Sequence, residues 1–138
     1  STKRILRRNA LAGRYLVISS EAHRAHGYHP DLVIFDELHT QPDRDLWDVL
    51  STSQINLDDA LMFAITTAGY DRLSICYQVH DEALRACEDR ALAPDLLAAI
   101  YAAGPDDDIE DPATWLKANP NLGISVVRDN LAAEIAKA

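Results

Sequence analysis

Leu32-Val-Ile-Phe-Asp36-Glu37 carries the strongest fold signal in the sequence. A run that is apolar on both faces fits the middle of a parallel sheet covered by helices. The acid pair that follows the run then lies at the carboxyl edge of the sheet, where open α/β sheets hold their ligands. The sequence therefore predicts a buried strand with a ligand site at its end.

An apolar strand followed by Asp-Glu is also the Walker B pattern of nucleotide hydrolases. Asp36 can hold Mg²⁺ there, usually through water. Glu37 can reach the water that attacks the γ-phosphate, and can orient or deprotonate it. Many strands end in solvent-exposed acids that take part in no chemistry. Taken by themselves, Asp36 and Glu37 therefore leave this structural alternative open. With His39 following, the same letters also suit a DExH helicase.

A second apolar strand is expected at 60–66, and it runs into Thr66-Thr67-Ala-Gly69. Hydroxyl groups at the same sheet edge can sense the γ-phosphate or its water and relay that state to a moving domain. The alternative is an ordinary strand that ends in threonines and a glycine turn. Thr66 and Thr67 are therefore candidate site residues whose role depends on what lies beside them.

Capping residues and apolar periodicity predict the other elements. Strands alternating with helices imply an α/β domain with a mainly parallel sheet flanked by helices. Residues 95–103 are rich in alanine and leucine, which favours a helix, although their length also allows a strand. Helices are expected over 2–13, 43–53, 72–90, 112–118 and 125–138, and further strands over 14–19 and 31–36.

Composition limits the function classes. No apolar run approaches the roughly 20 residues needed to cross a bilayer, and no signal peptide is visible, so we expect no membrane insertion. Cys76 and Cys87 are expected to be reduced thiols. The formal net charge is −9, and beyond Arg14 eight basic residues stand against twenty-two acidic ones. A free-standing DNA-binding module would need a basic footprint, which only the first predicted helix offers.

A third motif completes the pattern. Trp115-Leu-Lys-Ala-Asn-Pro-Asn-Leu-Gly123 follows the other two, and Gly27-Tyr-His-Pro30 precedes the first. By itself this segment indicates only core residues and a turn. The order of the motifs, with family-like spacing from about Leu16 to the end of the chain, resembles the phage terminase large subunit family. In that family an N-terminal ATPase motor drives DNA into the capsid, and a C-terminal nuclease cuts it.

The resemblance implies roles for the site residues. Asp36 and Glu37 would bind the nucleotide, and Asp36 would also bind Mg²⁺. Glu37 would be the catalytic carboxylate, and Thr66 and Thr67 would belong to the motif that couples ATP hydrolysis to motion. The fold would be part of a P-loop NTPase domain of the RecA-like type. The resemblance also favours a strand over 95–103.

The resemblance further divides the chain and names its partners. Residues 1–104 would be the C-terminal part of the motor domain, and residues 105–138 a linker segment toward the nuclease. The whole enzyme would act in the bacterial host's cytoplasm on double-stranded DNA, as a homo-oligomeric ring with the portal protein and the small terminase subunit. A DExH helicase fragment and a non-catalytic interaction module are the alternatives.

The sequence departs from a complete motor in one respect. No Gly-x-x-x-x-Gly-Lys-Ser/Thr loop occurs, so we expect the phosphate cradle upstream of Ser1 and negligible ATP hydrolysis by this chain alone. Ring motors complete their site with an arginine from a neighbouring subunit, for which Arg24 is the candidate; the alternative is a solvated surface residue.

His23, His26 and His29 recur every three residues, but glycine and proline interrupt any helix that would align them, so we expect no zinc.

Overall fold

The computed structural model describes residues 7–8, 11–13, 15–19 and 25–137. The chain forms two compact units, Ser1–Glu82 and Ala83–Ala138. The first unit holds the strands of the described residues, and the second consists of helices and loops. None of the described helices is both long enough and apolar enough to span a bilayer.

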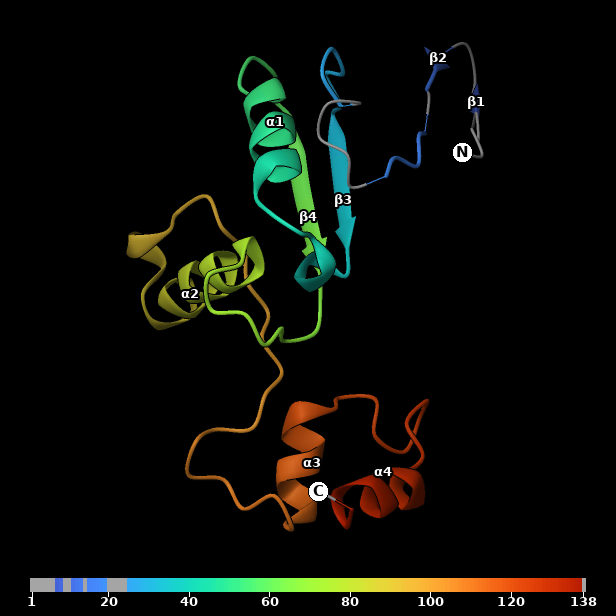
Figure 1. Cartoon of the computed structure of the whole chain (residues 1–138), viewed down its shortest axis with the longest axis vertical. Coiled ribbons are helices and arrows are strands. Elements are labelled where there is room, and N and C mark those ends of the chain that lie inside the picture. The colour runs from blue at the N-terminus through green and yellow to red at the C-terminus, as the bar shows by residue number, and fades with distance from the viewer. Residues whose placement is uncertain (1–6, 9–10, 14, 20–24, 138) are drawn as a thin grey trace. The chain divides into compact units, whose positions relative to one another are not determined.

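Two parallel strands form the centre of the first unit (Figure 1). Strand β3 (Leu32–Asp36) pairs with β4 (Leu61–Ile65), in a register that runs from Leu32↔Leu61 to Asp36↔Ile65. Both predicted strands are therefore confirmed. Because the strands are parallel and in step, whatever follows Asp36 and Ile65 lies at one common edge of the sheet.

Helix α1 (Asp45–Ser53) forms the crossover and covers one face of this sheet. Val33 and Phe35 point into that face and are buried together with Leu46 and Leu50 of the helix. The rings of Phe35 and Trp47 lie 5.2 Å apart between centroids. Burial of each such side chain stabilises the fold by about 1.5–3 kcal/mol, so the alternate residues of β3 fix the strand against the helix.

The other face of the sheet stays open among the residues that the structure describes. Apart from Asp36 at the carboxyl end, its side chains are apolar and about half exposed, which explains why the sequence reads as a continuous apolar run although only alternate residues are buried. They are Leu32, Ile34, Leu61, Phe63 and Ile65.

Gln54 fixes the amino ends of the two strands. Its side chain is only 8% exposed, and its Nε2 donates to the carbonyl oxygens of Pro30 and Leu61 at 2.9 and 3.3 Å. The Leu61 amide donates to the Asp31 carbonyl at 2.8 Å. A buried amide that bridges both strands holds their register at the end opposite the acid pair.

Helix α1 begins at Asp45, two residues after the predicted start, and ends where predicted at Ser53. The Asp43 carboxylate accepts a hydrogen bond from the Asp45 amide at 2.9 Å, which satisfies a free donor of the first turn. Arg44 donates from Nε and Nη2 to both oxygens of Asp48, at 2.7 and 3.0 Å. This two-pronged hydrogen bond lowers the pKa of Asp48. Arg44 also donates to Gln78 at 3.0 Å, which joins α1 to α2 (Ile75–Glu88), the helix expected over 72–90.

The amino-terminal predictions were wrong for the described residues. Instead of a helix over 2–13, β1 (Arg7–Arg8) pairs antiparallel with β2 (Leu11–Ala12). Helix propensity is a weak prior that backbone pairing overrides. Residues 15–19 form no strand beyond a single bridge at Tyr15, and Val17 is 60% exposed.

The strand expected over 95–103 was also wrong. Burial alternates along it, with Leu96, Ala98 and Ile100 half-buried between exposed neighbours, as in a strand. However, no hydrogen-bonded ladder forms there with any described segment. The apolar alternation is present, but the pairing that defines a strand is missing, which is why periodicity misled the prediction.

The second unit is built from short local elements. Helix α3 (Pro112–Ala118) begins at Asp111, whose carboxylate accepts from the Ala113 amide at 2.8 Å. Helix α4 (Arg128–Ile135) lies within the predicted 125–138 but buries no residue completely. Both helices are confirmed, together with the turn between them. The described residues also form two short 3-10 helices, η2 (Leu38–Thr40) in the first unit and η3 (Arg90–Leu92) in the second.

Candidate active site at the carboxyl edge of β3 and β4

The acid pair stands where β3 ends. Asp36 is the last residue of the strand and its side chain is exposed. Glu37 follows in the left-handed conformation, with φ 54° and ψ 55°. No other described residue apart from glycine has a positive φ. Such a conformation costs about 1–2 kcal/mol in a residue with a side chain, and strain of this kind gathers at functional sites.

The turn after Glu37 holds that conformation. The Glu37 carbonyl accepts two hydrogen bonds from Thr40, one from the amide and one from the hydroxyl, each at 2.9 Å. Leu38, between them, is 1% exposed and belongs to the core. A buried leucine anchors the turn, so the neighbouring Glu37 side chain is directed outward at the sheet edge, 52% exposed.

Thr66 connects the end of β4 to this turn. Its Oγ1 accepts from the His39 amide at 3.1 Å, and its hydroxyl donates to the Thr67 carbonyl at 2.8 Å. The two segments are 27 residues apart in sequence. The parallel pairing of β3 and β4 therefore brings the acid pair and the threonine pair to one edge.

The His39 imidazole lies between these two pairs. Its Nδ1 is 3.1 Å from Glu37 Oε2, 3.1 Å from Thr66 Oγ1 and 3.4 Å from Thr67 Oγ1. The ring is 28% exposed. One imidazole nitrogen thus contacts a member of the acid pair and both members of the threonine pair.

Gly69 lies against His39, and Cys76 lies against Thr66. A Cβ at Gly69 would be 3.1 Å from the His39 Cβ, which is closer than such contacts normally are. The Cys76 thiol is buried at the start of α2, 3.8 Å from Thr66 Oγ1. A glycine at 69 therefore leaves room for the histidine.

Four of the five residues predicted for the site are brought together: Asp36, Glu37, Thr66 and Thr67. Arg24 lies outside the described residues. The role of His39 as the link between the pairs was not predicted, because its neighbours Thr66 and Thr67 are distant in sequence. A histidine two residues after the glutamate, and a glycine three residues after the first threonine, were the available signals.

The donor set at this edge suits a magnesium ion that arrives with a nucleotide. Among the described residues no three His, Cys, Asp or Glu side chains come close enough to hold a metal by themselves. Mg²⁺ typically takes one or two protein carboxylates, with phosphates and water as its other ligands. Asp36 offers such an exposed carboxylate at the end of a rigid strand, so the residues present fit this use.

The architecture is that of an α/β domain. Its two parallel strands are joined through a helix and carry acids and hydroxyls at the carboxyl edge, which is the edge where open α/β sheets hold their ligands. The crystal structure of the HK97 bacteriophage large terminase resembles this chain with a TM-score of 0.68 and 27% identity, over 81% of this chain and 23% of that one. The fold is therefore a partial α/β domain of the P-loop ATPase type.

Sequence comparisons agree. Residues 7–85 match the family described as "Terminase large subunit, ATPase domain". Protein YmfN of Escherichia coli (strain K12) is 33% identical over 112 residues, which are 81% of this chain and 25% of that protein. The terminase large subunit of Enterobacteria phage HK97 is 29% identical over 126 residues, 90% of this chain and 24% of that protein.

The chain belongs to the terminase large subunit family, and residues 7–85 belong to its ATPase domain. It spans about a quarter of the length of the curated relatives it matches.

Proposed function

We propose that this chain supplies the hydrolytic edge of the ATPase motor of a phage terminase large subunit. The observation that carries the proposal is the meeting of Glu37 and Thr66 on the His39 ring at the carboxyl edge of two parallel strands. ATP is the nucleotide and Mg²⁺ the metal that this arrangement serves. Family membership supports nucleotide use by the motor.

Each acid has its own task in this proposal. Asp36 would hold the magnesium ion, either directly or through water, from the rigid end of β3. A bound ion would supply positive charge that offsets the negative charge of the phosphates. Glu37 orients the attacking water and accepts its proton, a function that contributes about 10²–10⁴-fold to a rate.

Thr66 and Thr67 act as the coupling element. Thr66 is bound both to the turn that carries Glu37 and to the backbone of Thr67. A change at the phosphate can therefore reach the segment that follows β4. We infer that this segment transmits the hydrolysis state to the motion that translocates DNA.

The remaining parts of the machine extend the proposal to the whole enzyme. It works in the cytoplasm of the bacterial host as a homo-oligomeric ring on double-stranded DNA, with the portal protein and the small terminase subunit. Arg24 is proposed to complete a neighbouring subunit's site. Residues 1–104 are assigned to the motor, and residues 105–138 to the linker toward the nuclease.

This chain alone should bind ATP poorly and hydrolyse it negligibly, since its sequence contains no phosphate-binding loop. A nucleotide titration of the 138-residue chain with and without Mg²⁺ measures this. Micromolar affinity would contradict the expectation.

The decisive experiment uses a chimaera. Residues 7–85 replace the matching stretch of the HK97 terminase large subunit, and ATP turnover is compared for the unaltered chimaera, Glu37→Gln and Asp36→Asn. Glu37→Gln should lower kcat by about 10²-fold or more while ATP still binds. Asp36→Asn should also raise the Mg²⁺ concentration needed for turnover. An active chimaera that Glu37→Gln leaves unchanged refutes the proposal.

Arg24→Ala in the same chimaera should abolish turnover but spare nucleotide binding, because a trans-acting arginine stabilises only the transition state. Mixing Arg24→Ala with Glu37→Gln subunits tests whether the arginine acts in a neighbour: some activity should return in mixed rings. Unchanged turnover of Arg24→Ala alone contradicts the assignment.

The DExH helicase reading of the Asp36-Glu37-Leu38-His39 spelling is set aside, because the chain belongs to the terminase large subunit family. A non-catalytic interaction module is the remaining alternative. The flanking gene sequence discriminates the two. A phosphate loop upstream and a nuclease downstream support the packaging motor, whereas a flanking sequence with neither supports an interaction module.

A further inference from the structure

The hydrogen atoms around the His39 ring can be assigned from its neighbours. The Glu37 carboxylate, when ionised, only accepts hydrogen bonds. The Thr66 hydroxyl hydrogen is directed to the Thr67 carbonyl at 2.8 Å, so Thr66 Oγ1 meets the ring as an acceptor. A bare Nδ1 could accept only from the Thr67 hydroxyl, the most distant of its three neighbours at 3.4 Å, and would set its lone pair against the oxygens of Glu37 and Thr66 at 3.1 Å. A proton on Nδ1 instead makes the ring the donor toward both of these nearer oxygens.

The backbone contact of the same residue is independent of the ring. The His39 amide donates to Thr66 Oγ1 at 3.1 Å whatever the side chain is, and the tight approach of Gly69 involves the His39 Cβ and Cα rather than the imidazole. A substitution that keeps a Cβ therefore leaves the connection between the two strand ends in place. It changes only the contacts that the ring makes with Glu37, Thr66 and Thr67.

We propose that His39 is a positioning residue, present as the Nδ1–H tautomer, which shares one N–H between the Glu37 carboxylate and the Thr66 hydroxyl and so sets the orientation of the catalytic carboxylate according to the state of the threonine segment. The proposal rests on the proposed function, because it takes Glu37 as the catalytic acid.

Two consequences follow for the site. The ring engages Oε2 of Glu37, so Oε1 is the oxygen that binds the attacking water. Because the same N–H is shared with Thr66, a movement of the segment after β4 alters the hydrogen bond to Glu37. His39 thus makes the rate of hydrolysis depend on the position of the threonine pair.

The tautomer is tested directly in the 138-residue chain. Long-range ¹⁵N–¹H correlation spectra, recorded at a pH where the rings are neutral, distinguish a protonated from a bare ring nitrogen. For His39 we expect a protonated Nδ1 and a bare Nε2, and Glu37→Ala should return the ring toward Nε2–H. His29, whose Nδ1 lies 3.2 Å from the Ser53 carbonyl, serves as a reference that Glu37→Ala leaves unchanged. An Nε2–H tautomer at His39 in the unaltered chain overturns the proposal.

The positioning role is tested by three substitutions of one side chain in the chimaera. Asparagine places its amide nitrogen one bond beyond Cγ, where Nδ1 lies, whereas glutamine places it one bond farther out. His39→Asn should keep kcat within about threefold, and His39→Gln and His39→Ala should lower kcat by about ten- to hundredfold, the cost of a misplaced catalytic group. The KM for ATP should change little in all three. His29→Ala, at the opposite end of the strands, is the matched control with unchanged kcat.

The outcomes separate the two proposals. If Glu37→Gln leaves turnover intact, the proposed function fails. If Glu37→Gln abolishes turnover while His39→Ala keeps full kcat, only the role of His39 fails. Equal losses in His39→Asn and His39→Ala likewise overturn it, because the donor at the δ position would then have no effect.

Discussion

The edge that carries Glu37 and the segment around Trp115 are held together in opposite ways. At the edge, hydrogen bonds of His39 reach Thr66 and Thr67, residues 27 and 28 positions away. Around Trp115, the indole donates to the Ile109 carbonyl at 2.6 Å, six residues away. The edge therefore exists only when β3 and β4 pair, whereas the Trp115 segment is specified by its own local sequence.

The two units also differ in their cores. All eight residues of the buried cluster belong to the first unit, including Phe35 and Leu38. In the described part of the second unit only Thr114 and Leu122 are buried. Stability scales with buried apolar area, so the first unit should unfold cooperatively and the second more readily. The fluorescence of Trp47 reports the unfolding of the first unit, and that of Trp115 the unfolding of the second. Replacing one tryptophan with phenylalanine leaves only the fluorescence of the other.

Phe35→Ala should have the largest effect, a loss of stability in the first unit alone. It removes a buried ring that contacts Trp47, a change that typically costs about 3–5 kcal/mol. Urea denaturation followed by Trp47 fluorescence measures the loss, while the Trp115 signal should be unchanged. Phe63→Ala is the matched control, since its side chain lies on the open face of the same sheet and is 50% exposed. Equal losses for both variants would show that the open face is covered in solution.

Gln54→Ala should have the next largest effect. The substitution leaves the carbonyls of Pro30 and Leu61 without the donor that bridges them, at a cost of about 1–3 kcal/mol. Faster amide exchange at the amino end of β4 measures the loosened register. Gln78→Ala, an exposed side chain bound to Arg44, should change stability by less than about 0.5 kcal/mol. The idea fails if the two variants are equally stable.

The same contrast explains what the sequence could reveal. Continuous apolar residues, the capping residue Asp43 and the proline at position 112 are local, and they correctly predicted β3, β4, α1 and α3. The meeting of Asp36 and Glu37 with Thr66 and Thr67 followed from parallel strands having a common edge. These are the features whose determinants lie within a few residues or in one topological rule.

The wrong or missing predictions concern features that depend on a segment distant in the sequence. Residues 95–103 have the burial alternation of a strand but pair with no described strand, and Arg7–Arg8 pair with Leu11–Ala12 where helix propensity favoured a helix. The link through His39 depends on the register of two strands, which no local pattern specifies. The open apolar face of the sheet could not be foreseen either, because an apolar run reads the same whether one face or both are buried.

Asp111→Ala tests the local character of the second unit. The carboxylate caps α3 through the Ala113 amide, and loss of such a cap costs about 0.5–2 kcal/mol. The Trp115 signal should shift to lower urea while the Trp47 signal stays in place. Asp106→Ala, an exposed acid in the same acidic loop, is the control with little effect. A shift of both tryptophan signals would show that the two units unfold together.

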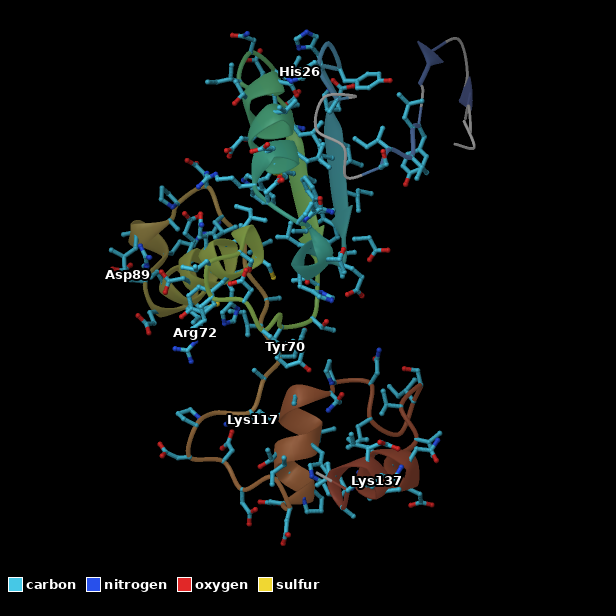
Figure 2. The ribbon with its side chains drawn as sticks, in the orientation of Figure 1. His26, Tyr70, Arg72, Asp89, Lys117 and Lys137 are labelled. Atoms are coloured by element: carbon cyan, nitrogen blue, oxygen red, sulfur yellow. The ribbon has the colours of Figure 1, made fainter. Side chains whose placement is uncertain are left out.

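The smallest effect concerns pH. Lys117, on α3 (Figure 2), donates to the Asp107 carboxylate at 2.6 Å, and the Gly104 amide donates to the same oxygen. These hydrogen bonds, the one from Lys117 first, lower the pKa of Asp107. A depressed pKa in the folded state contributes stability that is fully present above the usual carboxyl value of about 3.9 and is lost as pH falls through the lower folded value.

In an acid titration, the Trp115 transition should therefore weaken below the ordinary carboxyl range, and Asp107→Asn should remove that part of the pH dependence. Asp106→Asn, in the same loop, is the control that should retain it. Carboxyl carbon shifts of Asp107 measured by nuclear magnetic resonance give the pKa itself. A value at or above the usual one would mean that the Lys117 contact does not persist in solution.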